Sequence, residues 1–339
     1  MSTEVVAVDP ESPQSDAIGR AAEVIRRGGL VAFPTETVYG LGADALSETA
    51  VLRIFAAKGR PANNPLIVHV LDVAAARELT TAWPAVADQL AAAFWPGPLS
   101  IVLPKSSHVP DAVTAGGPTV ALRIPNHPVA RALIAASGRP LAAPSANPST
   151  RVSSVRAEHV MQGLVGKVDM ILDAGRTSGG LESTVVDLSG DAPRLLRPGL
   201  IDEQQLRRVL TAAPLWDCRH AQTTDAALPS PGMLAKHYSP SVPVHLTPGS
   251  GRDEVFRRAA TGRVIGWILR ETALSAVGPL PPNVRPVELG NEPAVYAARL
   301  YDTLHALESA GVDEIVVELP PDEVAWRAAR DRLQRAAAE

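Results

Sequence analysis

Short apolar runs that end abruptly in polar side chains constrain the fold of this chain more than any other feature. The first run, Leu30 to Phe33, stops at Pro34 and is followed at once by two threonines and a glutamate. Similar runs lie in TVALRIP (119–125), PLAAPSANPST (140–150), ESTVVDLSG (182–190) and LLRPG (195–199). Short apolar runs bounded by turn residues indicate buried strands, and polar groups at the ends of rigid strands are typical of a ligand site. We therefore expect these strand ends to meet at one cleft.

Two cations, Lys58 and Arg60, are separated by a single glycine and indicate which ligand the cleft could bind. By themselves they would favour a structural interpretation, because they follow a predicted helix and cations complement the dipole of a helix C-terminus. Other apolar runs also end in polar side chains, and these include Ser145, Asn147 and Arg197. Together the five residues favour a polyphosphate, since arginine offers a bidentate fork and lysine a point charge.

The polar residues around Glu36 admit several interpretations. Thr35 and Thr37 could bond the backbone of a turn, and Glu36 could be a solvated charge or lie near the ammonium of a ligand. His69 alternates with valines in a strand, where a lone histidine is usually structural, and a general base would need a pKa near the working pH. Arg123 interrupts an apolar strand, and because a buried guanidinium is costly unless paired, we expect an anionic ligand beside it.

The composition argues against several classes of protein. With 339 residues, of which 46% are hydrophobic and 20% charged, the chain has material for two domains and no sign of disorder. Aromatic residues make up only 4%, which argues against stacking on single-stranded RNA, and the net charge of −4 gives no overall nucleic-acid signature. The single cysteine, Cys218, permits no internal disulfide or cysteine-based zinc site and is interpreted as a bystander thiol. Without a signal-peptide pattern or an apolar run near the roughly 20 residues of a membrane span, we expect a cytoplasmic protein.

The hydrophobic periodicity predicts three segments. They are a large domain over 1–210, a linker or lid over 211–243 and a small domain over 244–339. In the first, helices are predicted at 16–27, 47–57, 83–94, 128–137, 158–164 and 202–210 among short strands. This irregular order favours α/β or α+β structure with a mixed, twisted sheet. The proline-rich 211–243 loses all periodicity. In the last segment four strands alternate with helices, which predicts a small Rossmann-like parallel sheet, without a GxGxxG nucleotide fingerprint.

Taken together, the motifs resemble the threonylcarbamoyl-AMP synthase family, whose catalytic unit is the YrdC-like domain. The resemblance rests on the KxR pair (Lys58, Arg60), the SxN pair (Ser145, Asn147) and the stretches PTETVYGLG, RPANNPLIVH, WPGPLS, RIPNHP and LRPG. It covers about residues 15–210 and resumes at SPGMLAKHYSP (230–240), similar to the linker motif of the two-domain members. It implies an α/β fold: a YrdC-like twisted mixed sheet with helices and a concave basic cleft, plus a smaller C-terminal Rossmann-like domain.

The resemblance also assigns the site. It implies catalytic roles for Lys58, Arg60, Ser145 and Asn147. The ATP contacts that it implies are Lys58, Arg60, Asn64, Thr119, Ser145, Ser153, Arg197 and His237. The threonine contacts that it implies are Thr37, His69, Arg123, Ser183 and the backbone of Ala143. It names no metal ligand, but Mg²⁺ is expected to accompany the triphosphate. In the linker, Leu234 and Ala235 depart from the commonest family form whereas His237 and Tyr238 are retained, so we expect a lid over the nucleotide.

The implied reaction converts L-threonine, bicarbonate or CO2 and ATP to threonylcarbamoyl-AMP and pyrophosphate, which makes the protein a nucleotidyltransferase. The product would pass to a tRNA threonylcarbamoyl transferase that forms N6-threonylcarbamoyladenosine. One alternative is a double-stranded RNA-binding module without catalysis, which would leave Thr37, His69, Arg123 and Ser183 without a purpose. A second is a carbamoyl-transfer maturation factor, whose cysteine-rich zinc modules a chain with one cysteine cannot hold. An RNA contact is left open, and no membrane contact is expected.

Overall fold

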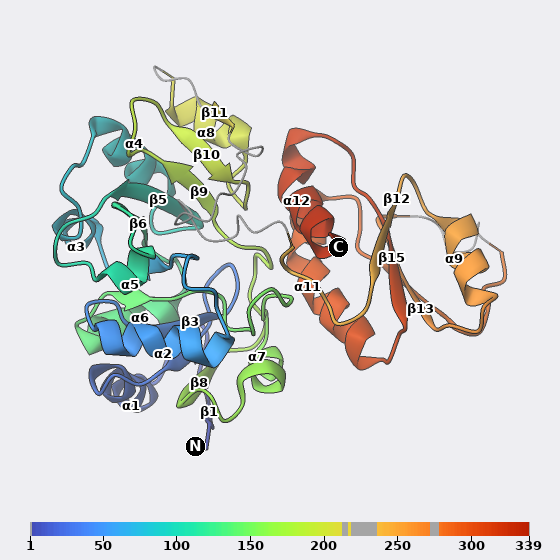
Figure 1. The fold of residues 1–339 in the computed structure, drawn as a ribbon, viewed down its shortest axis with the longest axis horizontal. Coiled ribbons are helices and arrows are strands. Elements are labelled where there is room, and N and C mark those ends of the chain that lie inside the picture. The colour runs from blue at the N-terminus through green and yellow to red at the C-terminus, as the bar shows by residue number, and fades with distance from the viewer. Residues whose placement is uncertain (1, 212–215, 218–235, 272–277, 339) are drawn as a thin grey trace.

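A computed structural model describes residues 2–211, 216–217, 236–271 and 278–338. Figure 1 shows a large α/β body followed by a smaller one, whose helices α11 (Pro293–Ser309) and α12 (Arg327–Ala336) lie between its sheet and the larger body, with α9 (Arg252–Ala259) on the other side of that sheet. Cys218 and most of the predicted linker lie outside the described residues. The predicted domain boundaries at residues 210 and 244 therefore stay predictions. Among the described helices, none is long and apolar enough to cross a membrane.

The larger body is built on a mixed sheet of eleven strands in the order β1-β8-β2-β3-β7-β4-β6-β5-β9-β10-β11. In chain order the strands are β1 (Glu4–Ala7), β2 (Val31–Phe33), β3 (Gly40–Asp44), β4 (Ile67–His69), β5 (Leu99–Pro104), β6 (Thr119–Arg123), β7 (Leu141–Ala142), β8 (Met170–Asp173), β9 (Thr184–Asp187), β10 (Arg194–Arg197) and β11 (Trp216–Asp217). Strands β4 and β6 are parallel and in register, so that His69 lies opposite Arg123. Gly40 of β3 forms a bridge to Ser145, just beyond β7. The sheet order therefore brings the polar strand ends together.

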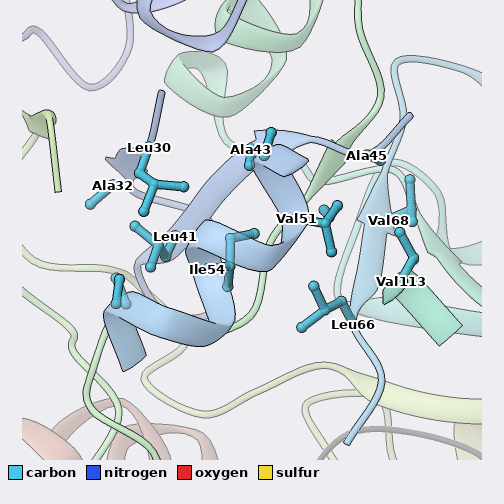
Figure 2. Packing of buried hydrophobic residues seen from close by; sticks show 14 of the residues in the cluster. Leu30, Ala32, Leu41, Ala43, Ala45, Val51, Ile54, Leu66, Val68 and Val113 are labelled. Carbon is cyan, nitrogen blue, oxygen red and sulfur yellow. The ribbon is translucent and has the colours of Figure 1, made fainter. Parts of the chain in front are cut away.

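Helices pack on the sheet through separate apolar clusters. The helices are α1 (Ser15–Arg26), α2 (Glu48–Lys58), α3 (Val73–Glu78), α4 (Ala85–Phe94), α5 (Asp111–Thr114), α6 (Pro128–Ser137), α7 (Ala157–Leu164) and α8 (Glu203–Val209). Helices α1 and α6 share one cluster with β2 and β8. Helices α2, α5 and α7 share another, which Figure 2 shows from Leu30 and Leu41 across Val51 and Ile54 to Leu66. Burial of this apolar area, worth roughly 25 cal/mol per Å², fixes the strand ends in space.

The end of helix α2 places the first pair of cations. Ser47 caps its start by accepting from the amide of Ala50, as its sequence predicts. Gly59 takes the left-handed conformation with φ of 60° and ends the helix directly after Lys58. Glycine has no Cβ and adopts this conformation without strain, so the chain can turn sharply after the helix. Arg60 then lies beside the loop that precedes β4.

Three local predictions are wrong or incomplete. Helix α1 spans Ser15–Arg26, one residue earlier at each end than the predicted 16–27, so Asp16, the residue expected to cap it, lies in its first turn. Strand β3 was not predicted, because the glycines of GLGAD suggest a turn. Gly42 is needed in the strand, where a Cβ would lie 2.6 Å from the ring of Phe33. The last predicted helix is divided into a 3-10 turn, η1 (Val324–Trp326), and the helix α12 (Arg327–Ala336).

The smaller body has a four-stranded sheet in the order β12-β15-β13-β14, and all three pairings are parallel. Its elements are β12 (Val244–Thr247), α9 (Arg252–Ala259), β13 (Ile265–Leu269), β14 (Val284–Glu288), α11 (Pro293–Ser309), β15 (Glu314–Glu318) and α12. Helices α11 and α12 pack against the larger body through a shared cluster that contains Val38, Val155, Leu181 and Leu300. The predicted small parallel sheet is thus present, joined to the first body by a continuous apolar core.

Candidate active site

The polar strand ends meet at one cavity in the larger body. The predicted site residues that line it are Thr37, Arg60, His69, Arg123, Ala143, Ser145, Ser183, Arg197 and His237. The remaining predicted residues, Lys58, Asn64, Thr119, Asn147 and Ser153, are not among its lining. Glu182 and Tyr238 line the cavity without having been assigned to the site from the sequence.

Lys58 joins the two motifs that the sequence analysis paired. Its Nζ donates to the carbonyl of Ser145 at 2.5 Å and to the carbonyl of Asn147. Burial lowers the pKa of Lys58 well below its usual value, and the neighbouring Arg60 lowers it further. The Asn147 amide donates to the carbonyls of Pro148 and Arg151, both at 2.9 Å. The side chains of Lys58 and Asn147 therefore stabilise the loop that carries the SxN pair, and neither of them lines the cavity.

Arg60 is braced by the loop that precedes β4. Its Nε donates to the Asn64 carbonyl at 2.9 Å, and its Nη2 donates to Asn64 Oδ1 at 2.7 Å and to the Pro65 carbonyl at 2.6 Å. Burial lowers the pKa of Arg60 to about 9, so the group remains a cation at neutral pH. Thr119 lies two residues before Ala121, which pairs with Ile67, and so falls at the Pro65 end of the same strands.

Arg197 and Ser183 form the opposite wall. Arg197 Nε and Nη2 donate to the Ser183 carbonyl at 3.1 and 2.9 Å, and Nη2 also contacts Ser183 Oγ at 3.1 Å. Ser183 Oγ lies 2.9 Å from Ser100 Oγ on β5. Because these groups are buried and mutually bonded, the Ser183 hydroxyl has a fixed position before any ligand arrives.

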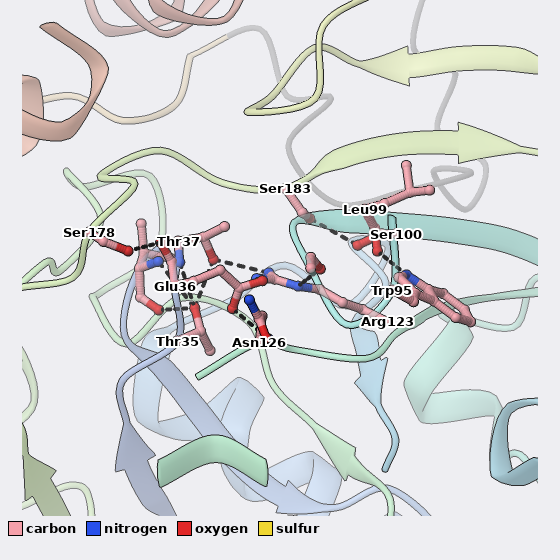
Figure 3. A network of polar contacts seen from close by, with 12 residues as sticks. Thr35, Glu36, Thr37, Trp95, Leu99, Ser100, Arg123, Asn126, Ser178 and Ser183 are labelled. Atoms are coloured by element: carbon pink, nitrogen blue, oxygen red, sulfur yellow. Dashed lines mark hydrogen bonds and ion pairs between the residues drawn. The ribbon is translucent and has the colours of Figure 1, made fainter. Parts of the chain in front are cut away.

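Arg123 is paired within the protein, contrary to the expectation that a ligand would be its partner. Figure 3 shows it between Glu36 and Thr37. Its Nη2 lies 2.7 Å from Glu36 Oε1, and its Nη1 donates to Thr37 Oγ1 at 3.0 Å. The other Glu36 oxygen accepts from the amide of Asn126 at 3.1 Å, and Glu36 is not among the residues that line the cavity. Glu36 thus holds Arg123 in place. The sequence feature that indicated this pairing was an acid three residues beyond the end of a buried strand.

His69 is buried beside Arg123 and packs edge-on against the ring of Phe33, with ring centroids 6.4 Å apart. Burial lowers its pKa to about 3, and the charge of Arg123 contributes. An imidazole with this pKa is neutral at pH 7 and a weak base. The geometry therefore favours a hydrogen-bonding role for His69 over general-base catalysis.

The chain that leads into the second body reaches the cavity. His237 and Tyr238 are buried at its edge, with their rings 4.0 Å apart. Burial lowers the pKa of His237 to about 3, so this ring too is neutral at pH 7. Tyr238 adopts a φ of 60°, which is uncommon for a residue other than glycine. Glu182 accepts from Ser153 Oγ at 2.5 Å, which places Ser153 behind the cavity wall.

Comparisons with known proteins agree with this geometry. Residues 23–199 match a domain family described as telomere recombination, and residues 201–338 match the threonylcarbamoyl-AMP synthase C-terminal domain. The threonylcarbamoyl-AMP synthase of Pyrococcus abyssi is 42% identical over 317 residues, which cover 93% of this chain and 92% of the relative. The chain belongs to the threonylcarbamoyl-AMP synthase family.

Members of this family match both bodies of the structure. The threonylcarbamoyl-AMP synthase of Bacillus subtilis is 40% identical over 337 residues, which cover 98% of this chain and 96% of the relative. The crystal structure of P. abyssi Sua5 complexed with L-threonine has a TM-score of 0.90 at 38% identity, over 98% of this chain and 97% of that chain. The predicted fold class, a mixed twisted sheet followed by a smaller parallel sheet, is confirmed.

Proposed function

We propose that the protein makes threonylcarbamoyl-AMP from L-threonine, bicarbonate or CO2 and ATP, as an L-threonylcarbamoyladenylate synthase of the nucleotidyltransferase class. One observation carries this proposal: a single cavity holds both the cations Arg60 and Arg197 and the group formed by Thr37, Arg123 and Ser183. The first set suits phosphate oxygens, and the second suits the carboxylate and hydroxyl of an amino acid. The P. abyssi relative whose structure contains L-threonine supports the assignment of the second set.

The chemistry needs positioning and charge neutralisation more than an enzyme nucleophile. The neutral threonine amine bonds to the carbon of CO2 or bicarbonate and forms a carbamate, with release of a proton to solvent if CO2 reacts and of water if bicarbonate reacts. A carbamate oxygen then attacks the α-phosphorus of ATP in line, the bond from that phosphorus to the β-phosphate oxygen breaks, and pyrophosphate leaves. Arg60 and Arg197 would offset the charge that develops on the phosphates. Arg123 would hold the threonine carboxylate.

Mg²⁺ is proposed to enter with the nucleotide. Within the described residues, no group of three or more histidine, cysteine or acidic side chains is placed to hold a metal ion. The acid that lines the cavity, Glu182, already bonds Arg332, Ser153 and Tyr301. This donor set fits an ion held mainly by triphosphate oxygens and water, which would neutralise part of the phosphate charge.

The product would be handed to a tRNA threonylcarbamoyl transferase.

The direct test is incubation of the protein with ATP, bicarbonate and labelled threonine, followed by detection of the adenylate and of pyrophosphate. We expect pyrophosphate release that depends on threonine. Pyrophosphate release without threonine dependence, or the absence of a labelled adenylate, would contradict the proposal. A double-stranded RNA-binding module without catalysis would retain RNA and release no pyrophosphate.

Substrate selectivity provides a separate prediction. The Thr37 hydroxyl is fixed by Arg123 and by Thr35 Oγ1 at 2.7 Å, and the Ser183 hydroxyl is fixed by Arg197. A site built to bond a substrate hydroxyl discriminates strongly against an analogue that lacks it. Threonine should therefore bind at least about a hundredfold more tightly than valine, with serine between them. Calorimetry with the three amino acids measures this, and equal affinities for threonine and valine would contradict the hydroxyl-binding assignment.

A further inference from the structure

The cavity contains an acidic side chain at a place where a triphosphate is proposed to bind. Among the described residues that line it, Glu182 alone carries a carboxyl group, next to the cations Arg60 and Arg197. Glu182 is buried, and a buried carboxylate without a partner is destabilising and repels other anions over several ångströms. A polyphosphate site with such a wall needs a cation to neutralise it.

That cation comes from the second body. Arg332 of helix α12 donates from Nε to Glu182 Oε2 at 2.7 Å, across 150 residues of sequence, and its side chain is fully buried. Its Nη2 donates to the Pro198 carbonyl at 3.0 Å, one residue beyond Arg197. Its guanidinium carbon also lies 4.9 Å from the ring centroid of Tyr238. Arg332 therefore contacts two residues of the cavity wall, Glu182 and Tyr238, and the backbone next to a third, Arg197.

Glu182 in turn holds a residue assigned to ATP. Its Oε1 accepts from Ser153 Oγ at 2.5 Å, and its Oε2 accepts from Tyr301 Oη of helix α11 at 3.1 Å. Burial raises the pKa of Glu182, but Arg332 and Arg197 outweigh it and lower the pKa to about 2, so the group is ionised at neutral pH. Ser153 is fully buried and does not line the cavity, so its hydroxyl acts on the site by donating to this carboxylate and holding it in place.

We propose that Arg332 is a positioning residue for ATP binding: through its ion pair with Glu182 it neutralises the carboxylate on the cavity wall and holds it in place beside the phosphate-binding cations. The inference rests on the proposed function, because it takes ATP as the ligand. Through Arg332, the second body contributes the cation that pairs with the cavity residue Glu182. A residue that only fastened the two bodies together would affect stability, without a preference for one substrate.

The test compares full-length variants by calorimetry with ATP and with threonine, by KM for each substrate and by melting temperature. Arg332→Met removes the charge at similar length, and we expect ATP affinity to fall by about tenfold or more, because one partner of a buried charge pair is left alone. Threonine affinity should change by less than about threefold, since the Arg123 wall is untouched. Arg330→Met is the matched control on the same helix, as Arg330 pairs with the exposed Asp322, and it should leave both affinities unchanged.

Rescue separates the positioning role from a structural one. Adding Glu182→Gln to Arg332→Met removes the unpaired charge, and the amide can still accept from Ser153, so ATP affinity should return to within about threefold of the wild type. If Arg332→Met does not fold, Arg332→Lys keeps the charge without the fork and should still weaken ATP binding more than threonine binding. Equal losses for both substrates, or a double variant as weak as the single one, would overturn the inference. Wild-type protein that binds ATP but forms no adenylate would contradict the proposed function instead.

Discussion

Replacing Arg60 with alanine should reduce threonylcarbamoyl-AMP formation by about a hundredfold or more, the usual effect of losing one donor that stabilises developing charge. Arg60 is a cation on the cavity wall, and Asn64 and Pro65 hold its fork in one orientation. The measurement is single-turnover formation of the labelled adenylate. Arg53→Ala is a suitable control, because Arg53 lies on helix α2, just before Arg60 in the chain, and pairs with Asp169 outside the cavity lining. Near-normal turnover of Arg60→Ala would remove Arg60 from the phosphate site.

Lys58→Ala should lose activity to a similar degree for a different reason. Because Lys58 donates to the carbonyls of Ser145 and Asn147, its removal leaves two acceptors of the SxN loop without their partner. The melting temperature should therefore fall together with turnover. Arg60→Ala should lower the melting temperature as well, because it leaves the acceptors of Asn64 and Pro65 without their donor. Thermal unfolding of both variants beside the single-turnover assay measures the two effects, and an unchanged melting temperature in Lys58→Ala would contradict its role in shaping the loop.

His237→Ala should weaken ATP binding by about tenfold, as expected when a polar contact in a water-excluded site is lost, with little change in melting temperature. His237 is buried against Tyr238 at the cavity edge, where it would help to shield a labile mixed anhydride from water. ATP titration by calorimetry measures the effect. His108→Ala, a change to an exposed histidine in another loop, is the control. Unchanged ATP affinity in His237→Ala would exclude a lid function for this residue.

Point variants in the full chain are the right test of the lid, because removal of the second body has additional consequences. Val38 and Leu181 of the first body share a buried cluster with Leu300 of α11, so a chain ending near Leu210 would expose apolar surface. Such a chain would also leave Glu182 without Arg332. The first body therefore does not have a fully self-contained core, although its periodicity suggests one.

Local sequence patterns determined most of the secondary structure, and the family resemblance indicated the residues of the site. Helix α6 has the bounds that a proline at the first helical position predicts. Ser47 and Gly59 fix the ends of α2 by capping, which is a property of a few adjacent residues. The KxR pair at the end of α2 and the SxN pair just beyond β7 likewise marked the cleft, since Arg60 and Ser145 both line the cavity.

Only the tertiary structure decided which charge pairs with which. Arg123 pairs with Glu36 across 87 positions of sequence, Lys58 bonds the carbonyls of the SxN loop, and Arg332 reaches Glu182 from the other body. These pairs form because burial makes an unpaired charge costly, and burial depends on the packing of both sheets. Strand β3 has the same origin, since its glycines read locally as a turn but fit closely against Phe33 once the sheet assembles. Sequence patterns thus placed the polar groups at the cleft, and desolvation in the folded chain selected their partners.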